Sequence, residues 1–219
     1  MILEALLVAH IAVLGYWLGS ELVINSTFRY VARSARMPFG ERNRLMDHVM
    51  DVDQHVRYAL VLQAGLGTIL GTQYGHFPGG DILAWTAAAA MVAWLVLVEA
   101  THRRRATPAG KRLAALDRGI RWLAIAVLVT AAVAALSGRV ELAPWLAWKL
   151  LAFAGVIGCG LAIRFALIRF YRTWAVIRSE GSSEAREREV RAVYVQATRT
   201  LGLLWTFIAV ITALSIAGS

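Results

Sequence analysis

The sequence predicts an all-α membrane protein, a polytopic bundle of about six transmembrane helices. Of its 219 residues 58% are hydrophobic, and the mean hydropathy is +0.58. Soluble domains contain about 45–50% apolar residues. The apolar residues also form long runs, and roughly 20 of them in a row are needed to cross a hydrocarbon layer about 30 Å thick. We therefore expect one transmembrane domain covering residues 1–219.

Six apolar segments are the predicted helices, and they cover residues 2–25, 54–74, 82–101, 119–137, 144–168 and 198–217. Each segment is apolar on nearly all sides, as a helix that faces lipid must be. The first segment has no basic stretch before it and no small-residue cleavage site after it. We interpret it as a retained helix and not as a signal peptide.

The basic residues predict the orientation of these helices. Most Arg and Lys residues lie in the connecting segments 26–53, 102–118 and 169–197, whereas 75–81 and 138–143 contain only Arg139. Cytoplasmic loops carry such an excess of positive charge. We expect these three basic segments inside a bacterial inner membrane and both termini outside. The net charge of +9 then indicates an anionic lipid surface as partner and argues against nucleic acid.

Two of the cytoplasmic segments are expected to be ordered. The segment 26–53 is amphipathic and is expected to lie along the inner membrane surface. In the segment 169–197 the helical pattern breaks at "SEGSS", and a new helix is expected near Ser183, supported by the pairs Glu184–Arg188 and Glu187–Arg191. This second segment predicts a helical hairpin. The apolar residues of the first segment are Phe28, Met37, Phe39, Leu45 and Met46.

Tryptophan and glycine residues predict how the helices meet the interface and one another. Trp85, Trp145 and Trp148 are expected at the outer interface and Trp122 and Trp174 at the inner one, as an aromatic belt. Gly67 and Gly71 form a G-x-x-x-G pair, which is typical of close helix packing, and a homodimer would use this face. The single cysteine, Cys159, excludes an internal disulfide and thiolate metal clusters.

Ionisable residues inside membrane helices are candidates for function, because their burial in lipid is costly. His10 lies roughly 12 Å from the outer end of the first helix and Lys149 roughly 8 Å from the outer end of the fifth. A neutral imidazole is a good axial ligand for haem b, and a lysine can bind a propionate or act as a second ligand. Alternatively, His10 bonds a backbone carbonyl and Lys149 reaches the interface.

A second, larger set of ionisable residues lies near the cytoplasmic side. His48, Asp51 and His55 share a helix face, and Glu99 with His102 forms an E-x-x-H pair. Nitrogen and carboxylate ligands suit transition-metal ions such as iron, zinc or manganese. The alternative is an ion-paired rim, in which Asp53 and Arg57 already form an i,i+4 salt bridge. The metal candidates are Glu21, His48, Asp51, His55, Glu99 and His102.

The first, second and fifth helices resemble a family of bacterial membrane proteins. The first reads "LLVAHIAVLGYWLGSEL", the second "DQHVRYALVLQAGLGTILG", and the fifth opens with W-x-x-x-K in "PWLAWKLLAFAGVIGCGLAI". These features are similar to those of HemJ-type protoporphyrinogen oxidases and CopD-type copper-resistance proteins. The resemblance implies a compact helical bundle with b-type haem in the first branch or copper handling in the second. His10 and Lys149 match the family's His and Lys by position.

Three functions follow as hypotheses. The first is a haem-binding redox protein that passes electrons or oxidises a hydrophobic substrate from within the bilayer, with His10 as axial ligand and Lys149 near the haem. The second is binding or transport of copper, iron or zinc by the cytoplasmic His and carboxylate set. The third is a structural subunit of a larger membrane complex. No Walker motif and no nucleotide-binding glycine motif after a strand occurs in the sequence.

Overall fold

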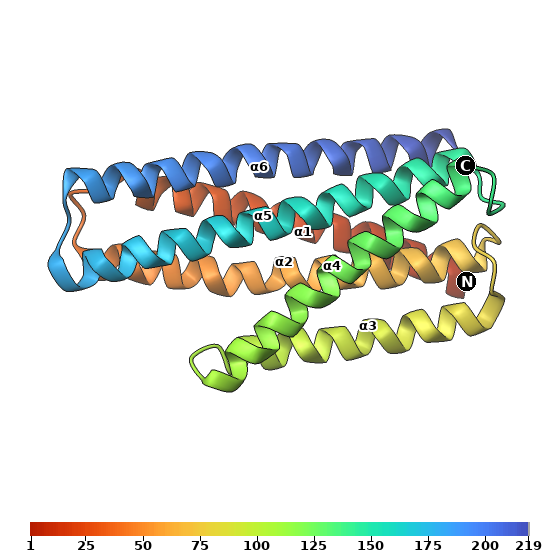
Figure 1. Cartoon of the computed structure of the whole chain (residues 1–219), viewed down its shortest axis with the longest axis horizontal. Coiled ribbons are helices and arrows are strands. Elements are labelled where there is room, and N and C mark those ends of the chain that lie inside the picture. Colours follow the sequence, from red (N-terminus) through yellow and green to blue (C-terminus); the bar gives the residue numbers. More distant parts are fainter. Residues whose placement is uncertain (219) are drawn as a thin grey trace. The chain divides into compact units, whose positions relative to one another are not determined.

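The computed structural model describes residues 1–218, and it is helical almost throughout. The helices are α1 (Ile2–Arg33), α2 (Phe39–Gln73), α3 (Gly80–Arg103), α4 (Pro108–Leu136), α5 (Pro144–Glu180) and α6 (Glu184–Ala217), as Figure 1 shows. No strand occurs among the described residues. The prediction of an all-α protein is therefore confirmed.

Five of the helices are long and apolar enough to cross a membrane, namely α1, α3, α4, α5 and α6. Their outward surfaces are apolar: Val96 of α3 is 63% exposed and Leu123 of α4 is also 63% exposed. Such side chains fit a lipid environment and would be unfavourable in water. The protein is thus a multi-pass membrane protein. The apolar part of α2 contains Arg57 and Gln63, and the sixth span stays a prediction.

The first two helices are longer than the sequence pattern indicates. In place of the surface-lying segment expected over 26–53, α1 continues to Arg33, and α2 starts at Phe39 after a connection of a few residues. Phe28 and Met46 are buried at 3% and 0% exposure. They pack against protein because both helix ends join other helices, which a local amphipathic pattern does not reveal.

The chain divides into two compact units that are described separately. Unit 1 consists of Met1–Ile24 and Met50–Ile120, and unit 2 of Asn25–Val49 and Arg121–Ser219. The long helices α1, α2 and α4 contribute to both units.

In unit 1, contacts between side chains fix the register of α1, α2 and α3. The Gln63 amide donates a hydrogen bond to the His10 carbonyl at 2.7 Å, and the Gln54 amide donates to the Val98 carbonyl at 3.3 Å. Further along, a Cβ atom at Gly65 would lie only 2.4 Å from the Met91 sulfur. Buried amides need such partners because lipid offers none. These contacts fix how far α1 and α3 are shifted along their axes relative to α2.

The glycine face of α2 is covered within the chain. A Cβ atom at Gly71 would lie 2.4 Å from the ring of Phe77, and one at Gly67 would lie 3.4 Å from the ring of His10. Close packing at the G-x-x-x-G pair is therefore confirmed. The expectation that a homodimer would use this face stays a prediction.

In unit 2, α5 and α6 run side by side as an antiparallel hairpin (Figure 1). Gly181 turns the chain with a φ of 87°, a conformation that other residues rarely adopt, and the Ser183 hydroxyl accepts a hydrogen bond from the Arg186 amide. The predicted helix start near Ser183 is confirmed. Gly155 lets the helices approach closely, since a Cβ atom there would lie 2.7 Å from the Phe207 ring.

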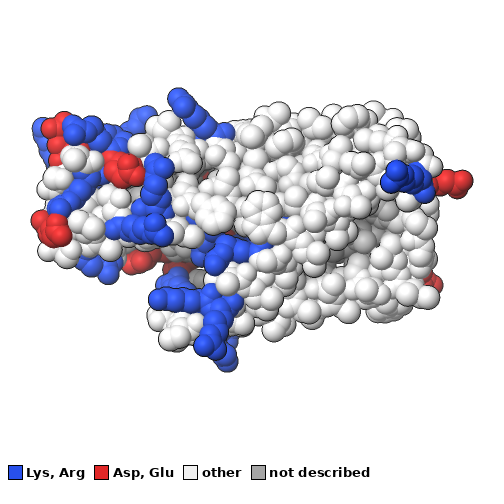
Figure 2. Space-filling view, viewed as in Figure 1, with Lys and Arg blue, Asp and Glu red and all other residues white. Residues whose placement is uncertain are grey.

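Charged side chains of unit 2 gather where α5 turns into α6, and the helix surfaces leading away from this turn are largely uncharged on the side shown (Figure 2). Trp148 is 54% exposed, as an interfacial position requires, but Trp174 is 1% exposed. The interpretation of Trp174 as part of an aromatic belt is therefore wrong. Its ring stacks on Phe170, with ring centroids 5.0 Å apart.

Candidate functional site

His10 lies on α1 and contacts Gly67 and Gln63 of α2, and all three residues belong to unit 1. The absence of a side chain at Gly67 lets the imidazole approach α2, with its Cε1 atom 3.4 Å from the position of a Cβ. The Gln63 amide bonds the His10 carbonyl. The residue as a whole is half-buried, and the Nδ1 atom of its ring is buried. This side of α1 is thereby held at a fixed level against α2.

Lys149 lies on α5 in unit 2 and is half-buried. Its Nζ atom lies 5.8 Å from the ring centroid of Trp145, one helical turn earlier, in a cation–π contact. His10 and Lys149 thus belong to different units. Their meeting at one site stays a prediction.

A hydrogen-bonded array of aromatic and ionisable side chains lies in unit 1. The Tyr16 hydroxyl bonds Nδ1 of His55, and the Tyr58 hydroxyl donates to the Glu99 carboxylate, which also accepts from Arg103. The rings of His55 and Tyr58 lie edge to face, with centroids 6.4 Å apart. The array therefore joins α1 to α2 and α2 to α3.

This array reaches the apolar part of α1. Tyr16 lies roughly 21 Å from the N-terminal end of α1, at a rise of about 1.5 Å per residue. Its partner His55 therefore lies beside a helix that is long and apolar enough to cross a membrane. Tyr16 is 46% exposed, and His55 is exposed as well. A hydroxyl and an imidazole in contact can exchange a proton, and this pair lies on a surface formed by α1 and α2.

Three other carboxylates of unit 1, all predicted to lie near the cytoplasmic side, accept hydrogen bonds from arginine or tryptophan side chains. Asp53 accepts two hydrogen bonds from Arg57, the shorter at 2.8 Å, so the predicted i,i+4 salt bridge is confirmed. Asp51 pairs with Arg105 across 3.3 Å. Glu21 is buried and accepts a hydrogen bond of 3.3 Å from the indole of Trp17.

The six metal candidates are not gathered into a ligand set. Among the described residues no three His, Cys, Asp or Glu side chains are placed to hold one metal ion. Five of the candidates, Glu21, Asp51, His55, Glu99 and His102, belong to unit 1, whereas His48 belongs to unit 2 and is exposed. Asp51 and Glu99 are paired with arginines, as in an ion-paired rim, whereas His55 is hydrogen-bonded to Tyr16.

A buried charged cluster in unit 2 was not anticipated from the sequence. Arg42 of α2 donates two hydrogen bonds to the Glu187 carboxylate of α6, at 2.7 and 2.9 Å, and a third to the Val31 carbonyl at 3.2 Å. Its guanidinium lies 4.9 Å from the ring centroid of Trp174. The Ser182 hydroxyl donates to Glu187 at 2.6 Å. Nearly every buried polar group of this cluster has a hydrogen-bond partner. We interpret the cluster as a structural contact that holds α2 against α6.

No short-range signal marks this cluster, because its two charged members are 145 residues apart. The expected Glu184–Arg188 pair is confirmed at 2.7 Å, but Glu187 turns to Arg42. No protein-family model matches the sequence, and searches among curated proteins and among solved structures found no significant match.

Proposed function

We propose that the protein binds haem b through His10 and acts as a redox protein of the membrane. The observation that carries the proposal is the place of His10, on the membrane-spanning helix α1 and against Gly67 of α2. An imidazole at this depth is the donor that b-type haem uses in proteins. The similarity of the surrounding motif to HemJ-type proteins supports the same ligand.

The residues around His10 fit such a group. The residue His10 is half-buried, and the missing side chain at Gly67 lets its imidazole lie close to α2. When bound, haem supplies one-electron redox chemistry. Gln63 holds the backbone of α1 at this position through its bond to the His10 carbonyl. A role of Lys149, by its positive charge, beside a propionate stays a prediction from the sequence.

Oxidation of a hydrophobic substrate also releases protons, and we propose that the pair of Tyr16 and His55 accepts them. Both side chains are exposed on unit 1 and bonded to each other. A substrate dissolved in the bilayer can reach this surface laterally. In this proposal the proton acceptor is the ring nitrogen of His55 that is not bonded to Tyr16.

The test is an absorption spectrum of protein purified in mild detergent from haem-replete cells, with metal analysis of the same sample. We expect a Soret band that falls strongly in His10→Ala and is retained in the control His76→Ala, which removes a histidine of the loop between α2 and α3. No Soret band in the parent protein, or an equal loss in both variants, would refute the proposal. Stoichiometric copper, iron or zinc without haem would move the function to metal binding.

One observation favours a second candidate function, a structural subunit of a larger membrane complex. Asp51, Asp53 and Glu99 are each paired with an arginine of the same unit. Such pairing accounts for these groups without a ligand or a reaction. A protein with neither haem nor metal that co-purifies with defined membrane partners would support this function.

A further inference from the structure

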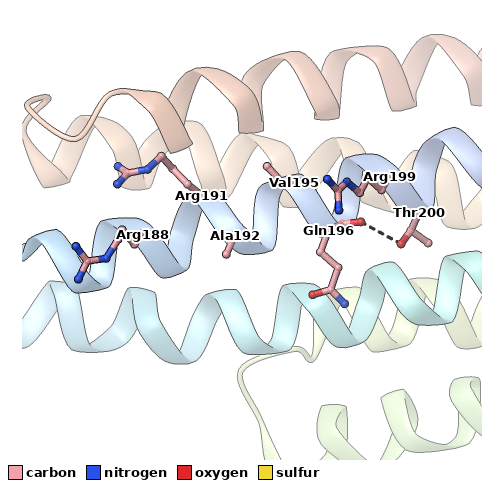
Figure 3. A pocket seen from close by; sticks show the side chains of 7 residues that line it. All are labelled: Arg188, Arg191, Ala192, Val195, Gln196, Arg199 and Thr200. Atoms are coloured by element: carbon pink, nitrogen blue, oxygen red, sulfur yellow. Dashed lines mark hydrogen bonds between the residues drawn. The ribbon is translucent and has the colours of Figure 1, made fainter.

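The outward face of α6 carries an open groove of about 660 Å³ near its cytoplasmic end (Figure 3). The opposite face of the helix is buried and includes Val190, Val193 and Leu201. The groove is thus a free surface of unit 2. Its lining residues all belong to α6 and are Arg188, Arg191, Ala192, Val195, Gln196, Arg199 and Thr200.

The groove is strongly basic, and two of its arginines are available to a ligand. Arg188 forms an ion pair with Glu184 at 2.7 Å. Arg199 forms no hydrogen bond or ion pair with any residue of the described chain. Arg191 lies near Glu187, but that carboxylate is bonded to Arg42 and Ser182. The groove therefore presents positive charge without a matching anion.

The polar and apolar residues alternate along this face in a way that suits an amphiphile. Arg191, Val195 and Arg199 form one ridge at i,i+4 spacing, with the valine between the two arginines (Figure 3). Val195 is 42% exposed. On the neighbouring ridge, Gln196 offers an amide donor. A phosphate can contact the guanidinium groups while an acyl chain covers the valine.

The position along α6 agrees with the headgroup region of a bilayer. Arg199 lies where the apolar run over 198–217 begins, and the segment before it is predicted to be cytoplasmic. A groove at this level faces the inner leaflet, whose anionic lipids attract basic side chains. We propose that this face of α6 is a binding site for the headgroup of an anionic phospholipid.

The test compares lipid binding by the whole protein in detergent, measured by native mass spectrometry with added phosphatidylglycerol or phosphatidylcholine. The variant replaces Arg191 and Arg199 with glutamine. The matched control replaces Arg33 and Arg36 with glutamine, which removes the same amount of charge. Both arginines are exposed near the connection between α1 and α2. Each arginine near an anionic membrane contributes about a fivefold gain in affinity, so the variant should bind phosphatidylglycerol about 25-fold more weakly.

We expect the control to bind within about twofold of the parent protein, since only a specific site separates two variants of equal charge. Equal losses in both variants would overturn the proposal and indicate a general attraction to the surface. Equal binding of phosphatidylcholine, or displacement of the lipid by millimolar inorganic phosphate, would also overturn it. The latter would identify a phosphate site that does not recognise lipid.

Discussion

The buried pair of Arg42 and Glu187 allows a quantitative test of what holds unit 2 together. The side chains of the two residues are 1% and 5% exposed. Removal of one partner from a buried ion pair leaves the other charge without compensation and costs about 3–5 kcal/mol. We therefore expect Arg42→Met to lower the free energy of unfolding by about that amount.

Replacement of both Arg42 and Glu187 tests whether the cost of each single variant comes from the charge that it leaves unpaired. Apolar residues in place of both charges commonly restore stability, because neither charge then has to be desolvated. The variant Arg42→Met with Glu187→Leu should thus be more stable than either single variant. It should not recover fully, since the Ser182 hydroxyl and the Val31 carbonyl lose their partners, at about 1–3 kcal/mol for each buried group left unsatisfied.

The measurement is unfolding in mixed micelles with increasing dodecyl sulfate, followed by circular dichroism. The control is Arg188→Met, which breaks the exposed pair with Glu184, and such pairs contribute about 0.3–0.5 kcal/mol. If Arg42→Met cost no more than Arg188→Met, the pair would not be buried in the membrane-embedded protein. A double variant less stable than both single variants would show that the charges stabilise beyond their mutual pairing.

Three further predictions concern packing, the array in unit 1 and the topology. Gly155→Ala should destabilise the α5–α6 hairpin by about 1–3 kcal/mol because its Cβ would meet Phe207, whereas Gly158→Ala, with open space around it, should be near neutral in the same unfolding assay. Tyr16→Phe should cost about 0.6–2 kcal/mol through loss of the bond to His55, and the exposed Tyr30→Phe should cost less; equal effects would contradict the bond. Cys159 is buried and should not react with maleimide, so a new cysteine can report which side of the membrane it faces. An impermeant maleimide should label Glu141→Cys from the outside and Ala185→Cys only after the membrane is opened; the reverse pattern would exclude the predicted orientation.

The helices follow from the sequence because lipid leaves the backbone few alternatives. A long apolar run must bond its own backbone, so length and hydropathy identify five spans directly. The end of α5 and the start of α6 are also readable, since Gly181 and the N-cap Ser183 are local signals. In such places, the residues that determine the structure are neighbours in the chain.

Partners across helices are not readable in this way. Arg42 has the pattern of a surface arginine in an amphipathic segment, yet it is buried because Glu187 and Trp174 come to it from α6 and α5. His55 has the spacing of a metal ligand, but its place is set by Tyr16 of α1. Such pairs depend on the register between neighbouring helices. The hydrophobic periodicity of a single sequence gives no information on that register.

The pairing of charges changes which residues require a functional explanation. Asp51, Asp53 and Glu99 are costly in a membrane only if they lack partners, and each has an arginine within its own unit. Their presence is then a matter of stability. His10 differs, because it lies in the apolar part of α1, away from the basic segments, and its ring contacts Gly67 of α2. An ionisable residue within a membrane-spanning helix is a candidate for ligand chemistry, and for this reason the search for activity should begin at His10 and not at the larger set of charges.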